Sequence, residues 1–314
     1  MNGKNATERL AAESDGIARA ASLLRAGRIV AVPTETVYGL AARADDAQAV
    51  ALVFEAKGRP SFNPLIVHVP DMAMAEALAD LDERARLLAS TFWPGPLTLV
   101  VPVRDGAPLA PAVTAGLPTV ALRCPAHPVM RQVLEATGHA LAAPSANRSE
   151  TVSPTSARHV LSTLDGRIDG IIDGGESRQG LESTIVALEP SGGWSMLRPG
   201  PVTADEVAAV LGNPPVDAGD GIRAPGQLAR HYAPGKPVRL DAAEAREDEF
   251  LLGFGETAGD WSLSPTGDLA EAAARLYAGL HRAAEAPHAR IAVAPVPDER
   301  LGAAINDRLR RASA

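Results

Sequence analysis

Short apolar runs alternate with helical patterns over the first two thirds of the chain, and this alternation restricts the fold more than any other feature. Apolar residues recur at helical spacing over 17–24 and 47–57, and glycine or proline follows each stretch as a stop signal. Strands are predicted at 28–32, 64–69, 97–103, 119–124, 140–143, 168–172 and 183–188. Strands alternating with helices are typical of an α/β fold.

The 314-residue length allows about two domains. Thr203 and Glu206 form a predicted capping box for a helix that ends the first domain, so we expect that domain to span 1–211. Residues 212–237 are rich in proline and glycine and lack periodicity, which predicts a long linker or covering loop. Strand-like runs at 249–254 and 290–296, with helical patterns at 269–281 and 301–309, predict a small second α/β domain over 238–314.

Charge and cysteine content exclude several classes of protein. A net charge of -8 and a pI near 5.4 argue against broad attraction to nucleic acid or anionic lipid, so any anion site must be a local cluster of cations. Cys124 is the single cysteine and rules out an internal disulfide framework. No apolar run approaches the ~18 residues of a membrane span, so we expect a cytoplasmic protein without membrane contact.

The common catalytic motifs are absent. The sequence contains no G-x-x-x-x-G-K-[ST] phosphate loop, no G-x-S-x-G nucleophile elbow and no H-E-x-x-H metal helix. Cys124 and His127 have the spacing of metal ligands but lack a second pair, so a core cysteine and a surface histidine is the better interpretation. We therefore predict no metal site built from side chains.

Lysine is rare, which draws attention to the lysine inside an ordered segment. The chain has three lysines against 27 arginines, and Lys57 ends a predicted helix two residues before Arg59. One interpretation is a structural cap, because the helix dipole stabilises positive charge at a helix C-terminus. With Ser61 and Asn63 they could equally grip a phosphate chain. The residues alone leave both interpretations open.

Two predicted strands carry one polar side chain on an otherwise apolar pattern. Alternation puts Leu65, Val67 and Val69 on one face and His68 on the other, where a lone histidine is more often structural. The same alternation puts Arg123 in a strand interior, where it needs an anion. That anion is either a structural carboxylate or a ligand.

Small polar residues follow other predicted strands. PTETVYGL, residues 33–40, presents three hydroxyls and a carboxylate directly after the strand at 28–32. Ser145 and Asn147 follow the strand at 140–143; turn chemistry explains such residues, and no histidine is placed to activate the serine as a nucleophile. Ser153 before Pro154 predicts the N-cap of the next helix.

Together these segments resemble the YrdC-domain threonylcarbamoyl-AMP synthases. The matching segments, in family order and spacing, are PTETVYGL, KGRPSFNPLIVHV, FWPGPLTLV, VALRCPAHP, APSANRS, LESTIV and LRPG. They cover about residues 14–211. The linker RAPGQLARHYAP and the tail LGAAINDRLRR look like the long, two-domain form of the family, although the second domain matches less densely.

The resemblance implies an enzyme that joins L-threonine, bicarbonate or CO2, and ATP with Mg2+ into threonylcarbamoyl-AMP, releasing pyrophosphate. Partner proteins would then transfer the threonylcarbamoyl group to tRNA beside the anticodon, with at most weak direct contact between this chain and tRNA. The implied fold is a twisted open YrdC-like α/β sheet with a deep cavity, covered by the linker, and a small Rossmann-like α/β C-terminal domain.

The resemblance also implies roles for individual residues. The central set that contacts ATP and the reacting groups is Lys57, Arg59, Ser145 and Asn147. L-threonine would be surrounded by Thr34, His68, Arg123, Ala143 and Ser183. Further contacts to ATP are expected from Ser61, Asn63, Thr119, Ser153, Arg198, His231 and Tyr232.

Two other functions stay open. YrdC-like domains have also been considered RNA-binding, which would make this a non-catalytic factor in tRNA or ribosome maturation; the net acidity counts against it. A carbamoyl-transfer enzyme that uses carbamoyl phosphate is the second alternative. Such proteins are expected to carry acylphosphatase and zinc-finger modules, and neither is recognisable in this sequence.

Overall fold

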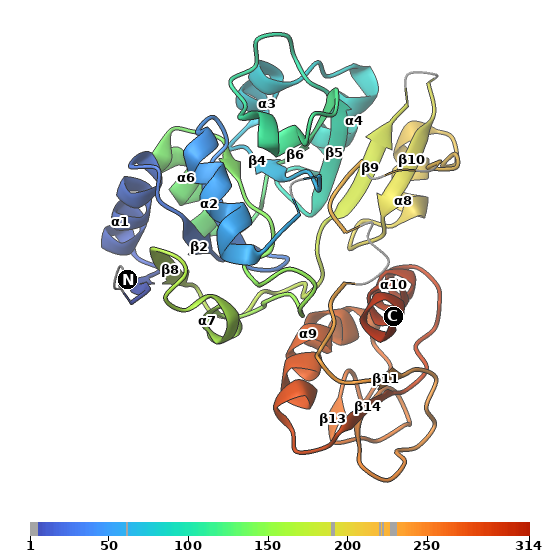
Figure 1. Ribbon diagram of the computed structural model, residues 1–314. Helices are drawn as coiled ribbons and strands as arrows, with labels where there is room; N and C mark the ends of the chain where they lie inside the picture. The colour runs from blue at the N-terminus through green and yellow to red at the C-terminus, as the bar shows by residue number, and fades with distance from the viewer. Residues whose placement is uncertain (1–5, 61, 190–191, 220, 222, 227–230) are drawn as a thin grey trace.

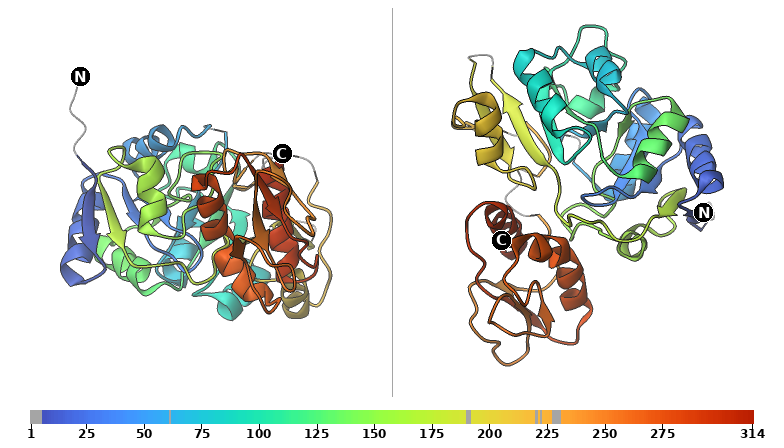
Figure 2. Two further views of the ribbon diagram at one scale, coloured as in Figure 1. Left: turned by 90° about the horizontal axis from the view of Figure 1, so that it is seen from below. Right: turned by 180° about the vertical axis from the view of Figure 1, so that it is seen from behind.

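The computed structural model describes residues 6–60, 62–189, 192–219, 221, 223–226 and 231–314. These residues form a larger N-terminal unit built on a ten-stranded sheet and a smaller C-terminal unit, drawn orange to red in Figure 1. The smaller unit is seen as a separate lobe beside the larger one in Figure 1 and in the right view of Figure 2. The α/β class predicted from the sequence is confirmed.

The ten strands form a mixed sheet in the order β1-β8-β2-β3-β7-β4-β6-β5-β9-β10. The strands are β1 (Glu8–Ala11), β2 (Val30–Val32), β3 (Gly39–Arg43), β4 (Ile66–His68), β5 (Leu97–Pro102), β6 (Thr119–Arg123), β7 (Leu141–Ala142), β8 (Gly170–Asp173), β9 (Thr184–Leu188) and β10 (Trp194–Arg198). The helices are α1 (Ser14–Arg25), α2 (Ala47–Lys57), α3 (Met72–Leu78), α4 (Glu83–Phe92), α5 (Pro111–Thr114), α6 (Pro128–Thr137), α7 (Ala157–Leu164) and α8 (Ala204–Leu211).

Alternation along β2 divides the core between two layers of helices. Val30 and Val32 pack in one cluster with apolar residues of α1 and α6. Ala31, which points the other way, packs in a second cluster with residues of α2 and α7. A strand that is apolar on both faces is therefore buried on both faces, as the continuous apolar run predicts.

The seven predicted strands and the helices at 17–24 and 47–57 are present, with ends shifted by a few residues. The predicted faces of β4 and β6 are also confirmed. Val67 and Leu122 lie in the main core cluster, whereas Ile66 and Ala121 lie in a different cluster on the other face. The capping box of α8, formed by Thr203 and Glu206, is present as predicted.

One local prediction, the cap at Ser153, differs from the structure, and strand β3 was not predicted. The N-cap of α7 is Ser156, whose side chain accepts the main-chain N–H of His159; Ser153 is not a cap, because its hydroxyl donates to Glu182 instead. β3 begins at Gly39, directly after the polar turn formed by residues 33–38, and pairs antiparallel with β2. The sequence shows no alternation of apolar and polar residues in β3.

The C-terminal unit contains a four-stranded parallel sheet in the order β11-β14-β12-β13. Its elements are β11 (Val238–Arg239), β12 (Glu249–Gly253), β13 (Trp261–Ser262), α9 (Leu269–Glu285), β14 (Arg290–Val293) and α10 (Leu301–Ser313). The predicted strands and helices of 238–314 are present. A parallel sheet flanked by helices is compatible with the Rossmann-like expectation, which stays a prediction.

An apolar cluster joins the two units. Val37, Val152 and Leu181 of the larger unit pack with Tyr232 of the linker and with the core of the smaller unit, including Tyr277. Val37 follows the end of β2 and Leu181 precedes the start of β9, so the segments at these two strand ends are held against the C-terminal lobe. Among the described residues, no helix is long and apolar enough to cross a membrane.

Candidate functional site

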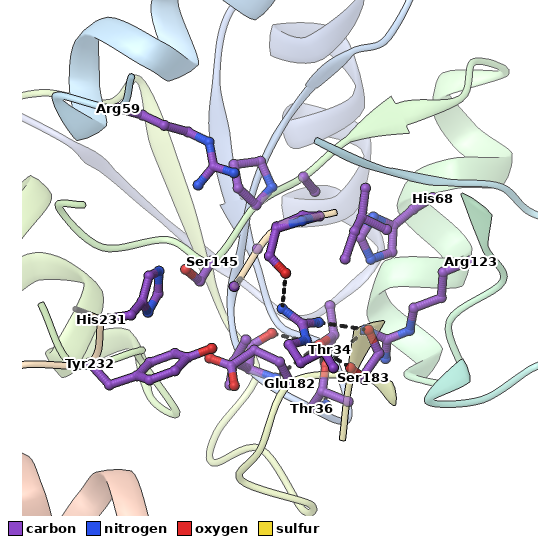
Figure 3. A pocket seen from close by; sticks show the side chains of 18 residues that line it. Thr34, Thr36, Arg59, His68, Arg123, Ser145, Glu182, Ser183, His231 and Tyr232 are labelled. Carbon is purple, nitrogen blue, oxygen red and sulfur yellow. Dashed lines mark hydrogen bonds between the residues drawn. The ribbon is translucent and has the colours of Figure 1, made fainter. Parts of the chain in front are cut away.

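A pocket lies where several strand ends of the large sheet meet the linker. Figure 3 shows its side chains: Arg59, Ser145, His231 and Tyr232 lie on one side, and His68 and Arg123 lie on the other. The lining residues are Thr34, Thr36, Val37, Gly39, Arg59, Ile66, His68, Arg123, Ala143, Pro144, Ser145, Glu182, Ser183, Arg198, Pro225, Gly226, His231 and Tyr232.

Register explains why distant sequence segments meet in this pocket. His68 and Arg123 are paired at the ends of the parallel strands β4 and β6. The end of β7 pairs antiparallel with β4, which brings Ala143 and Ser145 into the same region. His68 and Arg123 are themselves strand residues, so the sheet holds both of them in position.

Two guanidinium groups in the pocket have no carboxylate partner among the described residues. Arg198 is 4 % exposed and donates only to oxygens of Ser183 and to the Pro225 carbonyl. Arg59 is partly buried and donates to the carbonyls of Asn63 and Pro64. Burial, and then repulsion from Arg198, lowers the pKa of Arg59 to about 10. Cations buried without a counter-charge favour binding of an anion.

Arg123 does have a carboxylate partner. It donates to Glu35 Oε1 at 2.6 Å, to Thr36 Oγ1 at 2.9 Å and to the Gly95 carbonyl at 3.1 Å. Burial would raise the pKa of Glu35, but the charge and hydrogen bond of Arg123 outweigh it and lower the pKa. Of the two anions that the sequence left open, the structure contains the carboxylate. Since arginine has five N–H donors, two donors of Arg123, which lines the pocket, are without a partner among the described residues.

Three buried polar atoms in the pocket lack a hydrogen-bond partner among the described residues: His68 Nδ1, His231 Nδ1 and the Tyr232 hydroxyl. Burial is the main reason that the pKa of His68 and of His231 falls to about 3. Both rings are therefore neutral near pH 7. Because buried polar groups are almost always satisfied in proteins, these atoms are candidates for contact with a ligand.

The hydroxyls of the polar turn are largely occupied within the protein. Thr34 Oγ1 donates to the Val37 carbonyl and accepts the main-chain N–H groups of Thr36 and Val37, so it closes the turn between β2 and β3. Ser183 Oγ lies 2.7 Å from Thr98 Oγ1 and 3.1 Å from an Arg198 nitrogen. Both residues line the pocket, but their hydroxyls also fix its walls.

Glu182 is a pocket residue that sequence reasoning missed. It is 6 % exposed; one carboxylate oxygen accepts from Ser153 Oγ at 2.5 Å, and the other accepts from the Tyr277 hydroxyl and Arg308 Nε. Burial would raise the pKa of Glu182, but Arg308, then Arg198, then these hydrogen bonds lower it to about 2. The sequence feature that could have identified Glu182 is its position next to Ser183 in the segment LESTIV.

Lys57 and Asn147 lie behind the pocket wall. The buried Lys57 ammonium donates to the carbonyls of Ser145 and Asn147, at 2.5 Å each, and lies 3.4 Å from Asn147 Oδ1. The Asn147 amide in turn donates to the carbonyls of Arg148 and Thr151. Neither side chain is among those that line the pocket. Lys57 thus holds the loop that presents Ser145.

Of the other predicted residues, Thr34, Arg59, His68, Arg123, Ala143, Ser145, Ser183, Arg198, His231 and Tyr232 meet in the pocket. Asn63, Thr119 and Ser153 do not line it: Asn63 is buried below Arg59, Thr119 begins β6 at the end away from Arg123, and Ser153 binds Glu182. Ser61 lies outside the described residues. The ligand roles of all these residues stay predictions.

The side chains that line the pocket are cationic or neutral apart from Glu182, which is paired with Arg308. Within the described residues, no group of three or more His, Cys, Asp or Glu side chains is arranged to hold a metal ion. Such a pocket fits an anionic ligand that brings its own cation better than a metal held by the protein.

Comparison with known proteins places the chain in a family. A family model described as "Telomere recombination", named Sua5_yciO_yrdC, matches residues 22–200, and a model for the C-terminal domain of threonylcarbamoyl-AMP synthase matches residues 202–314. The chain is 41 % identical to the threonylcarbamoyl-AMP synthase of Pyrococcus abyssi, over 94 % of this chain and 93 % of that protein. It is 44 % identical to the Bacillus subtilis enzyme, over 78 % and 72 %.

The solved structures agree. The structure of P. abyssi Sua5 complexed with L-threonine has a TM-score of 0.89 and 37 % identity, covering 98 % of this chain and 97 % of that one. A variant of the same protein with a histidine and the next residue, a tyrosine, replaced by alanine has a TM-score of 0.88 and 36 % identity, covering 98 % and 96 %. The chain belongs to the threonylcarbamoyl-AMP synthase family, in its two-domain form.

Proposed function

We propose that this protein forms threonylcarbamoyl-AMP and pyrophosphate from L-threonine, bicarbonate or CO2, and the Mg2+ complex of ATP. The product would supply proteins that transfer the threonylcarbamoyl group to tRNA beside the anticodon. The observation that carries the proposal is the pair Arg59 and Arg198, two guanidiniums without carboxylate partners in one enclosed pocket. The family membership and the threonine complex of the P. abyssi relative support the choice of substrates.

The reaction asks for positioning and charge neutralisation. The threonine amine adds to CO2 and loses a proton, which gives a carbamate anion. A carbamate oxygen then attacks the α-phosphorus of ATP, and the bond to the bridging oxygen breaks as pyrophosphate leaves. Because negative charge accumulates on the phosphate oxygens, fixed cations such as Arg59 and Arg198 stabilise the transition state.

The pocket offers matching sites for the rest of the substrate. The two N–H donors of Arg123 without partners, with the free Nδ1 of neutral His68, would bind the threonine carboxylate and hydroxyl. A covalent nucleophile is unnecessary because the carbamate itself attacks. His231 and Tyr232 of the linker close the other side, which would protect the carbamate and the adenylate from water.

A non-catalytic RNA-binding role is less well supported. Among the pocket cations Arg123 and Arg198 are buried and Arg59 is partly buried, whereas RNA binding requires basic side chains on an accessible surface. The net charge of -8 opposes it as well.

Pyrophosphate release tests the proposal. The purified protein with Mg2+ and ATP should release pyrophosphate only when L-threonine and bicarbonate are both present. L-serine in place of L-threonine serves as a matched control for the side-chain methyl group. Release that ignores either co-substrate, or no release from folded protein, would contradict the proposed function.

A further inference from the structure

The Glu182 carboxylate joins the pocket to the C-terminal unit. It lines the pocket on one side, and on the other its Oε2 accepts from Tyr277 of α9 at 2.8 Å and from Arg308 of α10 at 2.9 Å. Arg308 is fully buried, and it also donates to the Pro199 carbonyl and to Asp307. A single carboxylate therefore links the loop before β9 to both C-terminal helices.

The Glu182 carboxylate lines the same pocket as Arg198, the buried arginine for which the described residues offer no ion-pair partner. Arg198 donates to Ser183, the next residue along the chain from Glu182, and both Arg198 and Glu182 line the pocket. Nevertheless, no ion pair joins Arg198 to a carboxylate within the described residues. Arg308 takes Glu182 instead, and its guanidinium carbon lies 5.4 Å from the centre of the Tyr232 ring.

A buried carboxylate that loses its partner must find another cation or become protonated. If Arg308 were absent, Arg198 would be the buried cation within the same pocket that Glu182 could pair with. That pairing would neutralise Arg198, and a phosphate of ATP would then have to displace a carboxylate from it. The C-terminal unit therefore affects the charge of the pocket as well as its shape.

We propose that Arg308 is a positioning residue for nucleotide binding: by holding Glu182 at the junction of the two units, it leaves Arg198 unpaired for an ATP phosphate. This inference rests on the proposed function for the identity of the ligand. It gives the C-terminal unit a role in substrate affinity beyond carrying the linker.

A double-mutant cycle with direct ATP binding tests the inference. In Arg308→Gln, the Kd and the KM for ATP should rise by about tenfold to a hundredfold, the effect of losing a charge-assisted contact, while kcat changes little. Glu182→Gln in the same chain removes the competing charge, so the double variant should recover to within about threefold of the wild type. Arg310→Gln, an exposed arginine on the same helix, is the matched control and should bind ATP normally.

The rescue separates this role from a merely structural one. If Arg308 only stabilised the fold, the double variant would bind ATP no better than Arg308→Gln, and that result would overturn the inference. If Arg308→Gln does not fold, the ATP affinity of the double variant is compared with that of the wild type instead. Equal ATP affinity supports the inference, and weak ATP binding by a folded double variant contradicts it.

Because ATP binding is measured without turnover, failure of the inference about Arg308 can be told apart from failure of the proposed function. If the wild type binds ATP and the cycle behaves as expected, but no threonine-dependent pyrophosphate appears, the proposed function fails while the inference stands. If the reaction occurs and Arg308→Gln keeps its ATP affinity, the inference alone fails. A wild type that does not bind ATP would contradict both.

Discussion

At the scale of the residue, Lys57 and Arg59 show that two cations in one motif can have different tasks. Arg59 lines the pocket, whereas the Lys57 ammonium is buried against the carbonyls of Ser145 and Asn147. Burial, and then repulsion from Arg59, holds the pKa of Lys57 well below its usual range. The sequence allowed either a structural role or a phosphate-binding role for this pair. The structure favours the structural role for Lys57 and leaves phosphate binding as the proposal for Arg59.

Substitution should separate these tasks. Arg59→Gln removes a pocket cation, so pyrophosphate release should fall by at least about a hundredfold, while the melting temperature stays within about 2 °C of wild type. Lys57→Met leaves two buried carbonyls without donors, so it should also lower the free energy of unfolding by about 2–4 kcal/mol. Chemical denaturation and pyrophosphate assays on both variants check this. Equal stability of the two variants would contradict the structural role of Lys57.

At the scale of the element, α7 and α9 meet through two stacked histidines. The His159 and His281 rings are 3.9 Å apart and nearly parallel, and the ring Nε2 of His281 lies 3.1 Å from the Ser153 carbonyl. Burial, then His281, lowers the pKa of His159 to about 3, and burial lowers the pKa of His281 too. Both rings are neutral in the folded protein at neutral pH, which permits the stack.

This stack should make the junction sensitive to acid. The unfolded chain takes up protons at these histidines below about pH 6.5. The folded protein takes up fewer because burial lowers the pKa of both rings, so stability falls as the pH drops below about 6.5. His281→Gln keeps a donor for the Ser153 carbonyl and removes one titrating ring. The loss of unfolding free energy between pH 7 and pH 5 should therefore be smaller in the variant than in the wild type. An identical loss in the variant and the wild type would refute this account.

Sequence patterns predict those elements whose cause is local. The strands near Val67 and Leu122 follow from alternation, and α8 follows from its capping box, because neighbouring residues determine both. The Ser153-Pro154 pattern predicts a helix cap, but the hydrogen-bond partner of Ser153 is Glu182, which lies 29 positions away in the chain. A local pattern contains no information about such a partner. Arg308 lies 126 positions from the same carboxylate, and no local pattern contains that contact. The pocket was predicted best where family motifs coincide with strand ends, as at His68 and Arg123.

At the scale of the whole molecule, one pocket depends on both units and on the linker between them. Strands β6 and β10 supply Arg123 and Arg198, and the segment after α2 supplies Arg59. The linker supplies His231 and Tyr232, and the C-terminal helices hold Glu182 through Tyr277 and Arg308. The two units share an apolar cluster that includes Tyr232, so this linker residue is packed between them. The arrangement explains how a small second domain can influence chemistry in the first without contributing a side chain to the pocket lining.

The central claim is that this pocket makes threonylcarbamoyl-AMP, and identifying the product by mass tests it most directly. The protein would be incubated with ATP, Mg2+, L-threonine and isotopically labelled bicarbonate, and the nucleotide products would be analysed by mass spectrometry. The account predicts an adenylate that carries one threonine and the bicarbonate label, and that is absent with Arg59→Gln. Formation of threonyl-AMP without the label, or of ADP or AMP alone, would contradict it.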